Sequence, residues 1–330
     1  MDKKNRLVDI DKAKGFAIFL VVLGHIVATD MPAGNEWYAA LKFYIYKFHM
    51  PFFMFISGII MAYTFRGFND FNGYLGYIVK KLRRLAPGYL FFGFLIYAGK
   101  LSMSNLMHVD DVPGDIGDEL YNLLVFPSKS AGGSLWFIYV LMEMYVVFPL
   151  VIVFFSKKLP LIVVFGFALE FVPVTNAFML DRFCEYFLFF SLWVFIVANY
   201  EVYLSVIEKY SYVFILLFFL SFLTIPFFAD NVSKVIIGIC SLPALQVIMR
   251  RGGFSNMNVW QIYGLYTYSI YLMNTIFIGV VKGIILSFTT WDGLNFIPIS
   301  VCLLIGGVYG PIFVKKFIFS RAPFLDRITS

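Results

Sequence analysis

Cysteine and charged residues are scarce in this 330-residue sequence. Charged residues make up 14% of it, and it has three cysteines. Cys184, Cys240 and Cys302 are widely spaced in apolar surroundings, which excludes a disulfide framework and the ligand spacing of a zinc site. We therefore expect no metal site. The sequence also lacks internal repeats, low-complexity tracts and linkers, so we expect a single domain over residues 1–330.

The basic residues do not form a nucleic-acid-binding stretch. The formal net charge is +6, but Lys and Arg lie in short segments between apolar runs, as they do in the cytoplasmic loops of membrane proteins. The N-terminus has a charged head and an apolar run, as a secretory signal does, yet no small-residue cleavage site follows. We expect neither a nucleic-acid partner nor a cleaved signal.

Apolar residues are abundant instead. They make up 61% of the chain, and the mean hydropathy is +0.82. These values predict an all-α, polytopic protein of the cell inner (plasma) membrane. With about 20 residues per span, the sequence predicts ten transmembrane helices. They run near 13–29, 44–64, 87–106, 134–155, 159–174, 184–199, 211–228, 234–249, 262–284 and 296–314.

The distribution of Lys and Arg predicts how the chain is oriented. When the spans alternate, most of the 26 basic residues fall on one side, which the positive-inside rule assigns to the cytoplasm. Both termini are then cytoplasmic, with short tails at 1–12 and 315–330. Residues 107–133 form the longest outer loop, either an outer vestibule or a solvated hairpin.

A basic segment on the inner side, residues 67–86, is expected to lie on the membrane surface. It contains Lys80-Lys81-Leu82-Arg83-Arg84 and ends at Pro87. Lys and Arg next to a membrane attract anionic lipid, so an amphipathic segment is predicted here. Membrane lipid is therefore an expected partner.

The stretch from Asp11 to His25 joins a polar head to an apolar helix that carries a histidine. In an α-helix, Lys14 and His25 are about 16 Å apart along the axis and about 20° apart around it. Asp11 lies about 60° from Lys14 around the axis and about 40° from His25, so the three groups share one stripe. An ionisable group at membrane depth indicates function. The alternative is an ordinary first span whose histidine hydrogen-bonds a neighbouring helix.

The second span carries another histidine near the same outer surface. His49 and His25 are expected at similar depth on neighbouring antiparallel helices. Pro51 lacks an N–H and is expected to open the helix backbone beside them. Ser57-Gly58 follows in the middle of the span, where Gly58 is interpreted as a site of close helix packing.

Three polar residues in later spans have roles that the residues alone leave open. Glu143 and Glu170 are unpaired carboxyls in the fourth and fifth spans. Either could orient a histidine, or each could be a protonated structural acceptor. Asn274 in the ninth span has the same two interpretations.

Five motifs, in order over most of the chain, carry a resemblance. They are Asp11-x-x-Lys14-Gly15 with Leu23-Gly24-His25, then Phe48-His49-Met50-Pro51-Phe52-Phe53 with Ser57-Gly58, Lys81-x-x-Arg84-x-x-Pro87-x-Tyr89, Ser134-Leu135-Trp136-Phe137, and Tyr268-Ser269-Ile270-Tyr271-Leu272. The set resembles the bacterial integral-membrane acyltransferase family 3. Two positions depart from the family pattern, because Lys14 stands where many members have arginine and Asn274 where many have histidine.

The resemblance implies a membrane O-acyltransferase, usually an O-acetyltransferase. Such an enzyme moves an acyl group from cytoplasmic acyl-CoA, most often acetyl-CoA, to a hydroxyl of a cell-surface carbohydrate or its lipid-linked precursor. Acyl-CoA would be a co-substrate, and no permanently bound cofactor is expected. The distance of about 16 Å between Lys14 and His25 is comparable to the length of the pantetheine arm of CoA.

The resemblance and the stripe together suggest a role for each polar residue. His25 is the expected general base on the acceptor hydroxyl, with an acyl-imidazole intermediate as the other possibility. His49 would polarise the carbonyl or orient the acceptor. Lys14, Arg84 and Lys81 would bind the donor, with Asp11 positioning Lys14. The expected acceptor-binding or supporting residues are Ser57, Trp136, Glu143, Tyr271 and Asn274.

A proton-coupled transporter or flippase of a glycan precursor is the alternative function. Ten spans with buried histidines and acids would suit it, but the sequence has no paired interrupted helices and no two-half repeat. A binding or sensory membrane protein also fits the residues alone. For an acyltransferase, two arrangements stay open: acyl delivery across the membrane to an outer acceptor, or a wholly cytoplasmic site.

Overall fold

The computed structural model describes residues 3–28, 31–106, 109, 112–155, 158–251 and 257–330. Within these ranges every regular element is a helix, as the composition predicts. The α-helices of the first half are α1 (Lys3–His25), α2 (Glu36–Tyr46), α3 (His49–Thr64), α4 (Phe71–Met103), α5 (Ile116–Val125), α6 (Trp136–Phe154) and α7 (Pro160–Leu169). Those of the second half are α8 (Leu180–Ser191), α9 (Trp193–Ile196), α10 (Tyr200–Lys209), α11 (Ser211–Ser221), α12 (Asp230–Arg250), α14 (Asn258–Leu265), α15 (Thr267–Leu286), α16 (Phe296–Phe317) and α17 (Pro323–Ile328).

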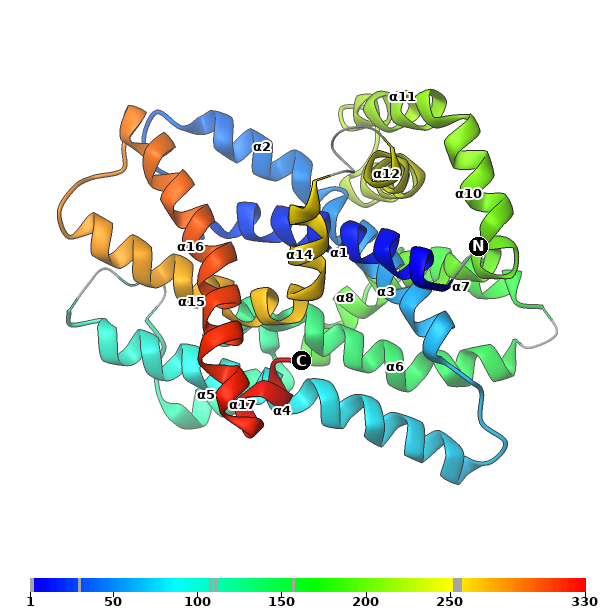
Figure 1. Ribbon diagram of the computed structural model, residues 1–330, viewed down its shortest axis with the longest axis horizontal. Helices are drawn as coiled ribbons and strands as arrows, with labels where there is room; N and C mark the ends of the chain where they lie inside the picture. Colours follow the sequence, from blue (N-terminus) through cyan, green and yellow to red (C-terminus); the bar gives the residue numbers. More distant parts are fainter. Residues whose placement is uncertain (1–2, 29–30, 107–108, 110–111, 156–157, 252–256) are drawn as a thin grey trace.

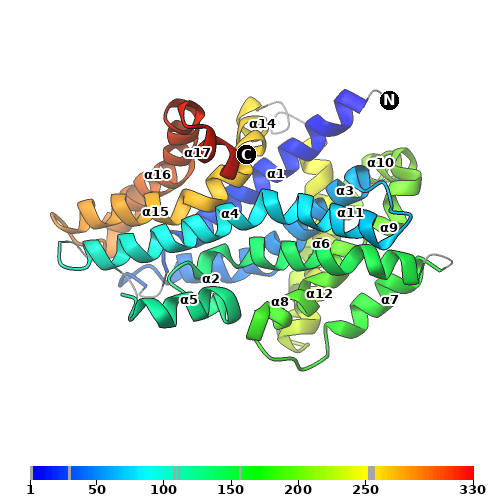
Figure 2. The same cartoon turned by 90° about the horizontal axis from the view of Figure 1, so that it is seen from below.

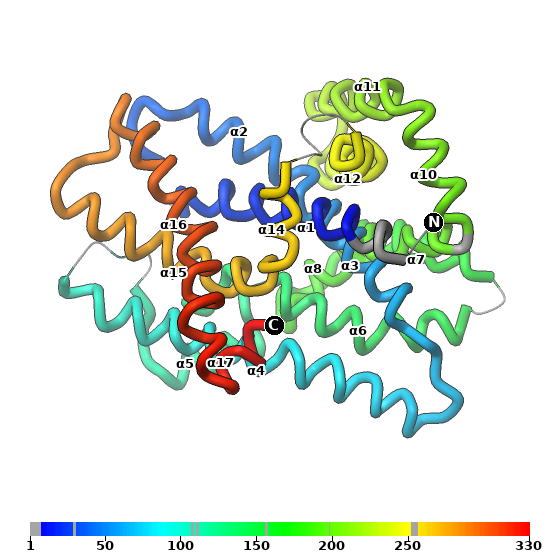
Figure 3. The backbone as a smooth tube through the Cα atoms, viewed as in Figure 1, coloured from blue at the N-terminus to red at the C-terminus, as the bar shows by residue number. Residues whose placement is uncertain are grey.

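Helix α1 runs through the middle of the molecule (Figure 1). It packs against α2, α3, α12, α14, α15 and α16. Its side chains Ala17, Ile18 and Val22 are fully buried. In Figure 3 the yellow α14 crosses the blue α1, and α12 is seen end-on beside them. The first helix and the last quarter of the chain therefore share one core.

Helices α1 and α14 approach each other closely at two glycines. A Cβ added to Gly15 would overlap the carbonyl oxygen of Trp260, and one added to Gly264 would overlap the carbonyl oxygen of Asp11. Because only glycine lacks a Cβ, only glycine allows the two backbones to come this close. This crossing fixes the polar start of α1 against α14.

Replacing Gly15 with alanine is expected to destabilise the protein. The added methyl group would force the two helix backbones apart, and overpacking of this kind costs about 1–3 kcal/mol. Thermal unfolding of the detergent-purified protein would show a lower Tm. The matched control is Gly279→Ala on α15, where an added Cβ meets nothing within 4 Å. Equal Tm values for the two variants would contradict the close crossing.

Several helices could cross a membrane. Among the described residues, six segments are long and apolar enough by length and composition, and a seventh exists if the bent pair Ala177–Ile196 and Tyr200–Lys209 crosses as one span. The six are Glu36–Thr64, Phe71–Met103, Gly133–Phe154, Asp230–Arg250, Thr267–Leu286 and Gly293–Arg321. Large apolar side chains are also exposed, as expected for a surface in contact with lipid; Phe154 is 83% exposed and Phe288 is 87% exposed. The polytopic all-α class is confirmed, whereas the count of ten spans and the predicted topology are not.

Three of the predicted spans do not meet the length and charge expected of a membrane-crossing helix. Helix α1 has charged residues at positions 9, 11, 12 and 14, so its uncharged part is confined to residues 15–25. Helix α7 has 10 residues, and the apolar helix Ser211–Thr224 is also shorter than 18 residues. A helix needs about 20 apolar residues to cross the hydrocarbon core alone. These segments therefore cannot cross the hydrocarbon core alone and need neighbouring helices to do so.

Proline divides the predicted second span. The segment expected as one helix over 44–64 consists of α2, which ends at Tyr46, and α3, which begins at His49. In a continuous helix the ring of Pro51 would clash with the carbonyl of Lys47, four residues earlier. In the first turn of α3 the proline removes no helical hydrogen bond. The break at residues 47–48 lies beside His49, where Pro51 was expected to open the helix backbone.

The prediction that the basic segment 67–86 ends at Pro87 was wrong. Pro87 lies inside α4, a helix of 33 residues that joins the basic segment to the predicted third span. Asp70 caps its start by accepting a hydrogen bond from the Gly73 N–H at 2.7 Å. The basic residues therefore continue directly into an apolar helix.

The predicted outer loop 107–133 is largely structured. Residues 107–108 and 110–111 lie outside the described part, and the rest includes α5 and a 3₁₀ turn at Pro127–Lys129. The buried carboxylate of Glu119 accepts hydrogen bonds from the Ala131 N–H at 2.9 and 3.1 Å. Burial raises the pKa of Glu119 above its ordinary value. Buried groups such as Glu119 and Leu123 thus anchor the loop, whereas residues 114–118 are exposed.

Candidate functional site

The end of α1 is held by one face of α2. Three side chains at a spacing of four residues donate hydrogen bonds to backbone carbonyls at and just beyond the end of α1, where helix carbonyls lack partners within the helix. The pairs are Tyr38 with Leu23, Lys42 with Val27 at 2.6 Å, and Tyr46 with Gly24 at 3.0 Å. These contacts fix the residues on both sides of His25.

His25 is oriented by Asn274 of α15. The Oδ1 atom of Asn274 lies 2.8 Å from Nδ1 of His25. The amide nitrogen of Asn274 is already engaged, since it donates to the carbonyls of Ile270 at 3.0 Å and Tyr271 at 2.8 Å. An amide oxygen only accepts hydrogen bonds, so Nδ1 of His25 carries the proton. The lone pair of Nε2 is then available, and Nε2 has no hydrogen-bond partner among the described residues.

His49 lies next to this pair and has the same tautomer. It is the first residue of α3, and its Nδ1 donates a hydrogen bond to the carbonyl of Ile45 at 2.8 Å. Its ring lies 4.9 Å from the ring of Tyr46, centroid to centroid. The hydroxyl of Tyr46 donates to Gly24, the neighbour of His25. Tyr46 thus connects the two histidines, and each presents a free Nε2 acceptor.

No role was predicted for Tyr46, although it lies three residues before His49. The space for its ring depends on Gly24, because a Cβ there would lie 2.6 Å from the ring. The glycine directly before His25 was the signal in the sequence that could have indicated a side chain packed against the helix at this point.

The start of α6 is held against α15 by Tyr271 and against α8 by Trp136. Tyr271 donates a hydrogen bond to the carbonyl of Ser134 at 2.7 Å and accepts one from the Phe137 N–H at 3.1 Å. Trp136 stacks on Tyr186 of α8, with the ring centroids 5.4 Å apart. Because Tyr271 precedes Asn274 by one helical turn, these contacts also fix the position of Asn274 along α15 relative to α6.

Lys14 and Asp11 form the ion pair expected from their shared stripe. Lys14 Nζ lies 2.6 Å from Asp11 Oδ1, and both side chains are partly exposed. Both residues lie on the same continuous helix as His25. The spacing between Lys14 and His25 along the helix is therefore the one that the sequence predicts.

Lys81 and Arg84 diverge, although they lie one turn apart on α4. Lys81 donates a hydrogen bond to the hydroxyl of Thr64 at 3.2 Å and lies 4.5 Å from the centroid of the Tyr145 ring. Arg84 lines an open pocket of about 740 Å³ between α4 and α17. We call it the basic pocket, because its charged lining residues are Lys80, Arg83, Arg84 and Arg327. Such a surface attracts anions.

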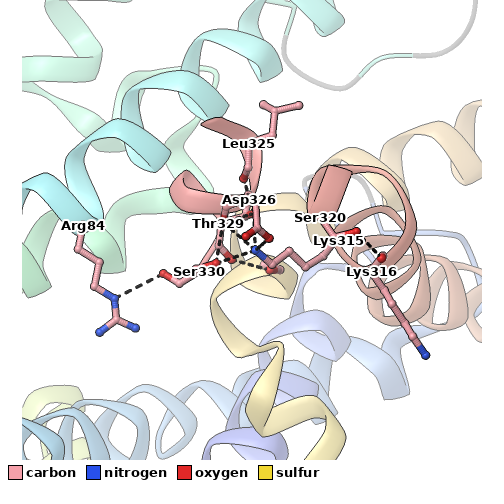
Figure 4. A network of polar contacts seen from close by, with 9 residues as sticks. Arg84, Lys315, Lys316, Ser320, Leu325, Asp326, Thr329 and Ser330 are labelled. Carbon is pink, nitrogen blue, oxygen red and sulfur yellow. Dashed lines mark hydrogen bonds and ion pairs between the residues drawn. The ribbon is translucent and has the colours of Figure 1, made fainter. Parts of the chain in front are cut away.

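Helix α17 is fastened over this pocket by a polar network (Figure 4). Lys315 Nζ donates to the carboxylate of Asp326 at 2.7 Å and to the hydroxyls of Thr329 and Ser330 at 3.1 and 2.7 Å. Arg84 Nε donates to the carbonyl oxygen of Ser330 at 3.4 Å. The network therefore joins the end of α16 to α17 and to the basic face of α4.

Ser57 and the two glutamates do not reach the histidines by any described hydrogen bond. Ser57 donates to the carbonyl of Phe53, one turn earlier in α3. Glu143 and Glu170 each have a buried Oε2 with no hydrogen-bond partner among the described residues, and Glu143 lies near Asp181. The described hydrogen-bond partners of the two histidines are other groups. Asn274 orients His25, and the carbonyl of Ile45 holds His49.

A second pocket, of about 460 Å³, was not predicted from the sequence. Its lining residues are Glu170, Arg182, Glu185, Asp230, Asn231 and Lys234. We call it the mixed-charge pocket. Opposite charges near the ends of several apolar segments were the available signal, but which of them pair depends on helix packing. In Figure 2, α8, which lines this pocket, and α17, which lines the basic pocket, lie at opposite edges of the molecule.

The described side chains form no metal-binding cluster. Among the described ranges, no group of three or more His, Cys, Asp or Glu side chains is placed to hold a metal ion. The arrangement as described offers an oriented imidazole, a second imidazole beside it and two charged pockets. An imidazole with a free Nε2 can accept a proton from a hydroxyl group.

Comparison with known proteins identifies the family of this chain. The acyltransferase domain family matches residues 7–316. The nodulation protein NolL of Mesorhizobium japonicum is 27% identical over 173 residues, which are 52% of this chain and 43% of that protein. The nodulation protein NolL of Sinorhizobium fredii is 42% identical over 62 residues, 18% of this chain and 17% of that protein. The aligned part of the chain thus spans less than half the length of each of these curated relatives. No solved structure matches significantly.

The family match covers the polar start of α1, both histidines, the basic face of α4 and Asn274. It favours an acyltransferase over the transporter alternative. The resemblance seen in the five sequence motifs is confirmed by a match over nearly the whole length. The chain belongs to the integral-membrane acyltransferase family 3.

Proposed function

We propose that this protein is an O-acyltransferase of the plasma membrane, most simply an O-acetyltransferase. It transfers an acyl group from cytoplasmic acyl-CoA to a hydroxyl of a cell-surface carbohydrate or its lipid-linked precursor. The observation that carries the proposal is the hydrogen bond between Asn274 and His25. It leaves the Nε2 atom of His25 in the form that a general base requires.

The chemistry follows from this tautomer. Nε2 of His25 takes the proton of the acceptor hydroxyl while the hydroxyl oxygen attacks the thioester carbonyl carbon. The carbon–sulfur bond breaks, and the thiolate of CoA takes the proton from the imidazolium. The products are the acyl ester and CoA thiol, and His25 returns to its starting form. An acyl-imidazole on Nε2 is the alternative route, with the imidazole attacking first.

His49 fits one of its two expected roles better than the other. Its Nδ1–H is used by the carbonyl of Ile45, so its Nε2 accepts a hydrogen bond and cannot donate one to a carbonyl oxygen. We therefore assign His49 to orienting the acceptor hydroxyl rather than to polarising the thioester.

The basic pocket supports binding of the donor. The nucleotide end of CoA carries phosphates, and guanidinium groups such as those of Arg83 and Arg84 bind phosphate in a bidentate manner. Lys14, on the helix that leads to His25, would hold the donor along its path. Because Lys14 acts as a point charge, arginine should replace it well, whereas alanine should not.

Labelled acetyl-CoA added to membranes that contain the protein is expected to give a carbohydrate-bound ester that mild alkali releases. The Arg84→Ala variant should need a higher donor concentration for the same rate, with little change at saturation. Lys14→Ala should behave similarly, and Lys14→Arg should stay close to the wild type. The matched control is Lys316→Ala, because Lys316 is exposed beside Phe317 and is not a lining residue of the basic pocket.

The assay also shows how the proposal would fail. If membranes with the wild-type protein form no more alkali-labile ester than membranes without it, the proposed function is wrong. If Arg84→Ala and Lys316→Ala have the same dependence on donor concentration, the basic pocket is not the donor site.

A further inference from the structure

The mixed-charge pocket has the size and the position of a substrate site. Its volume of about 460 Å³ falls within the range of about 300–1,000 Å³ that small-molecule sites occupy. It opens where α7 ends and where α8 and α12 begin. The chemistry assigned to His25 makes no use of it.

The cations of this pocket are already neutralised by carboxylates. Arg182 pairs with Glu185 at 2.7 Å, and Lys234 also pairs with Glu185. Asp230 pairs with Lys47, which lies two residues before His49. The charges fix the shape of the pocket without giving it an excess of positive charge. In this it differs from the basic pocket, whose charged lining is entirely basic, so it does not suit a phosphate.

Two polar groups in the lining remain for a ligand. The buried Oε2 of Glu170 has no hydrogen-bond partner in the described part of the chain. A buried carboxylate oxygen without a donor is costly, and a ligand hydroxyl would supply that donor. Asn231 is exposed at the mouth, and its Oδ1 accepts a hydrogen bond from the Val232 N–H at 2.9 Å, which leaves its NH₂ group to donate to a ligand. These are the groups that neutral, hydroxyl-rich molecules use.

The pocket also connects with the histidines through aromatic rings. The Nζ atom of Lys234 lies 4.9 Å from the centroid of the Tyr186 ring, and Tyr186 stacks on Trp136. Trp136 is followed by Phe137, whose N–H is bound by Tyr271, one turn before Asn274. Asp230, which also lines the pocket, pairs with Lys47, two residues before His49. A ligand in the pocket is therefore next to the acyl-transfer site.

We propose that the mixed-charge pocket binds the sugar that accepts the acyl group, with Glu170 and Asn231 as hydrogen-bonding partners of its hydroxyls. This inference rests on the proposed function and adds the place of the acceptor. The ligand chemistry is a neutral sugar ring. The ring can come from a soluble polysaccharide chain or from a lipid-linked glycan.

The test uses carbohydrate from the producing cells after alkali has removed its esters, which restores free acceptor hydroxyls. The purified full-length protein receives acetyl-CoA, and release of CoA thiol is measured as the carbohydrate concentration rises. Glu170→Gln removes the carboxylate at nearly constant size, and Asn231→Trp fills the mouth without breaking an ion pair. Both should raise the KM for carbohydrate by about tenfold, the effect of about 1.4 kcal/mol, and leave the KM for acetyl-CoA unchanged. Glu36→Gln, at an exposed position at the start of α2, is the matched control.

Two forms of the probe separate the two sources. One is the water-soluble polysaccharide, and the other is the glycolipid fraction that organic solvent extracts. A KM effect with only one of them identifies the source, and an effect with either supports the site. If both variants keep the wild-type KM for both probes while the wild type still transfers, the pocket is not the acceptor site although the function stands. If the wild type itself shows no carbohydrate-dependent CoA release, function and site fail together.

Discussion

Replacing His25 with glutamine is expected to lower kcat by about 10²–10⁴-fold, the usual contribution of a general base. Glutamine can keep a hydrogen bond to Asn274 but cannot accept a proton at neutral pH. The KM for acetyl-CoA should stay near the wild-type value, because donor binding is assigned to groups on α4 and to Lys14. CoA release by the purified protein, measured over a range of both substrates, separates kcat from KM.

Two observations must accompany this result. The Tm of His25→Gln should match that of the wild type, since otherwise the loss reflects misfolding. The same change at His49 should act more on the KM for carbohydrate than on kcat, because His49 is assigned to orienting the acceptor. Near-normal turnover by His25→Gln would make His49 the leading candidate for the base.

Asn274→Leu is expected to reduce kcat by about 10- to 100-fold, comparable to the loss of an outer partner that orients a metal-bound histidine. Leucine has a similar volume but no acceptor for the Nδ1–H of His25, so the ring loses its fixed tautomer and orientation. The KM for acetyl-CoA should not change. A purely structural role would lower the Tm and the yield of folded protein without a specific fall in kcat.

Two further variants sharpen the test of Asn274. Thr275→Val removes a hydroxyl at the neighbouring position, where Thr275 contacts Ser134 at 3.3 Å, and should leave kcat nearly unchanged. Asn274→His restores a group that can accept a hydrogen bond and should be more active than Asn274→Leu. If Asn274→Leu and Thr275→Val have the same kcat, Asn274 does not orient the base.

Much of the site follows from local patterns in the sequence. The eleven-residue spacing of Lys14 and His25 needed only a continuous helix, and α1 is continuous over both. The ion pair of Asp11 with Lys14 follows from their i,i+3 spacing. The roles given to these residues remain predictions, because geometry alone does not test them.

The errors arise where distant segments meet or where a proline has two possible effects. Pro87 lies within a helix, although it was expected to end the basic segment. Glu143, Glu170 and Asn274 were all candidates to orient a histidine, and it is helix packing that brings Asn274 to His25. The mixed-charge pocket depends on contacts between α7, α8 and α12, which no local spacing encodes.

The arrangement of α1 has a consequence for biosynthesis. Helix α1 is made before the helices that pack on it, and its charged first half makes insertion into the bilayer on its own unfavourable. The helix that packs on it most extensively, α14, is synthesised more than 200 residues later, and so is α15. His25 meets Asn274 only then. A nascent chain that ends before α14 therefore lacks both the close crossing at Gly15 and Gly264 and the hydrogen bond between His25 and Asn274.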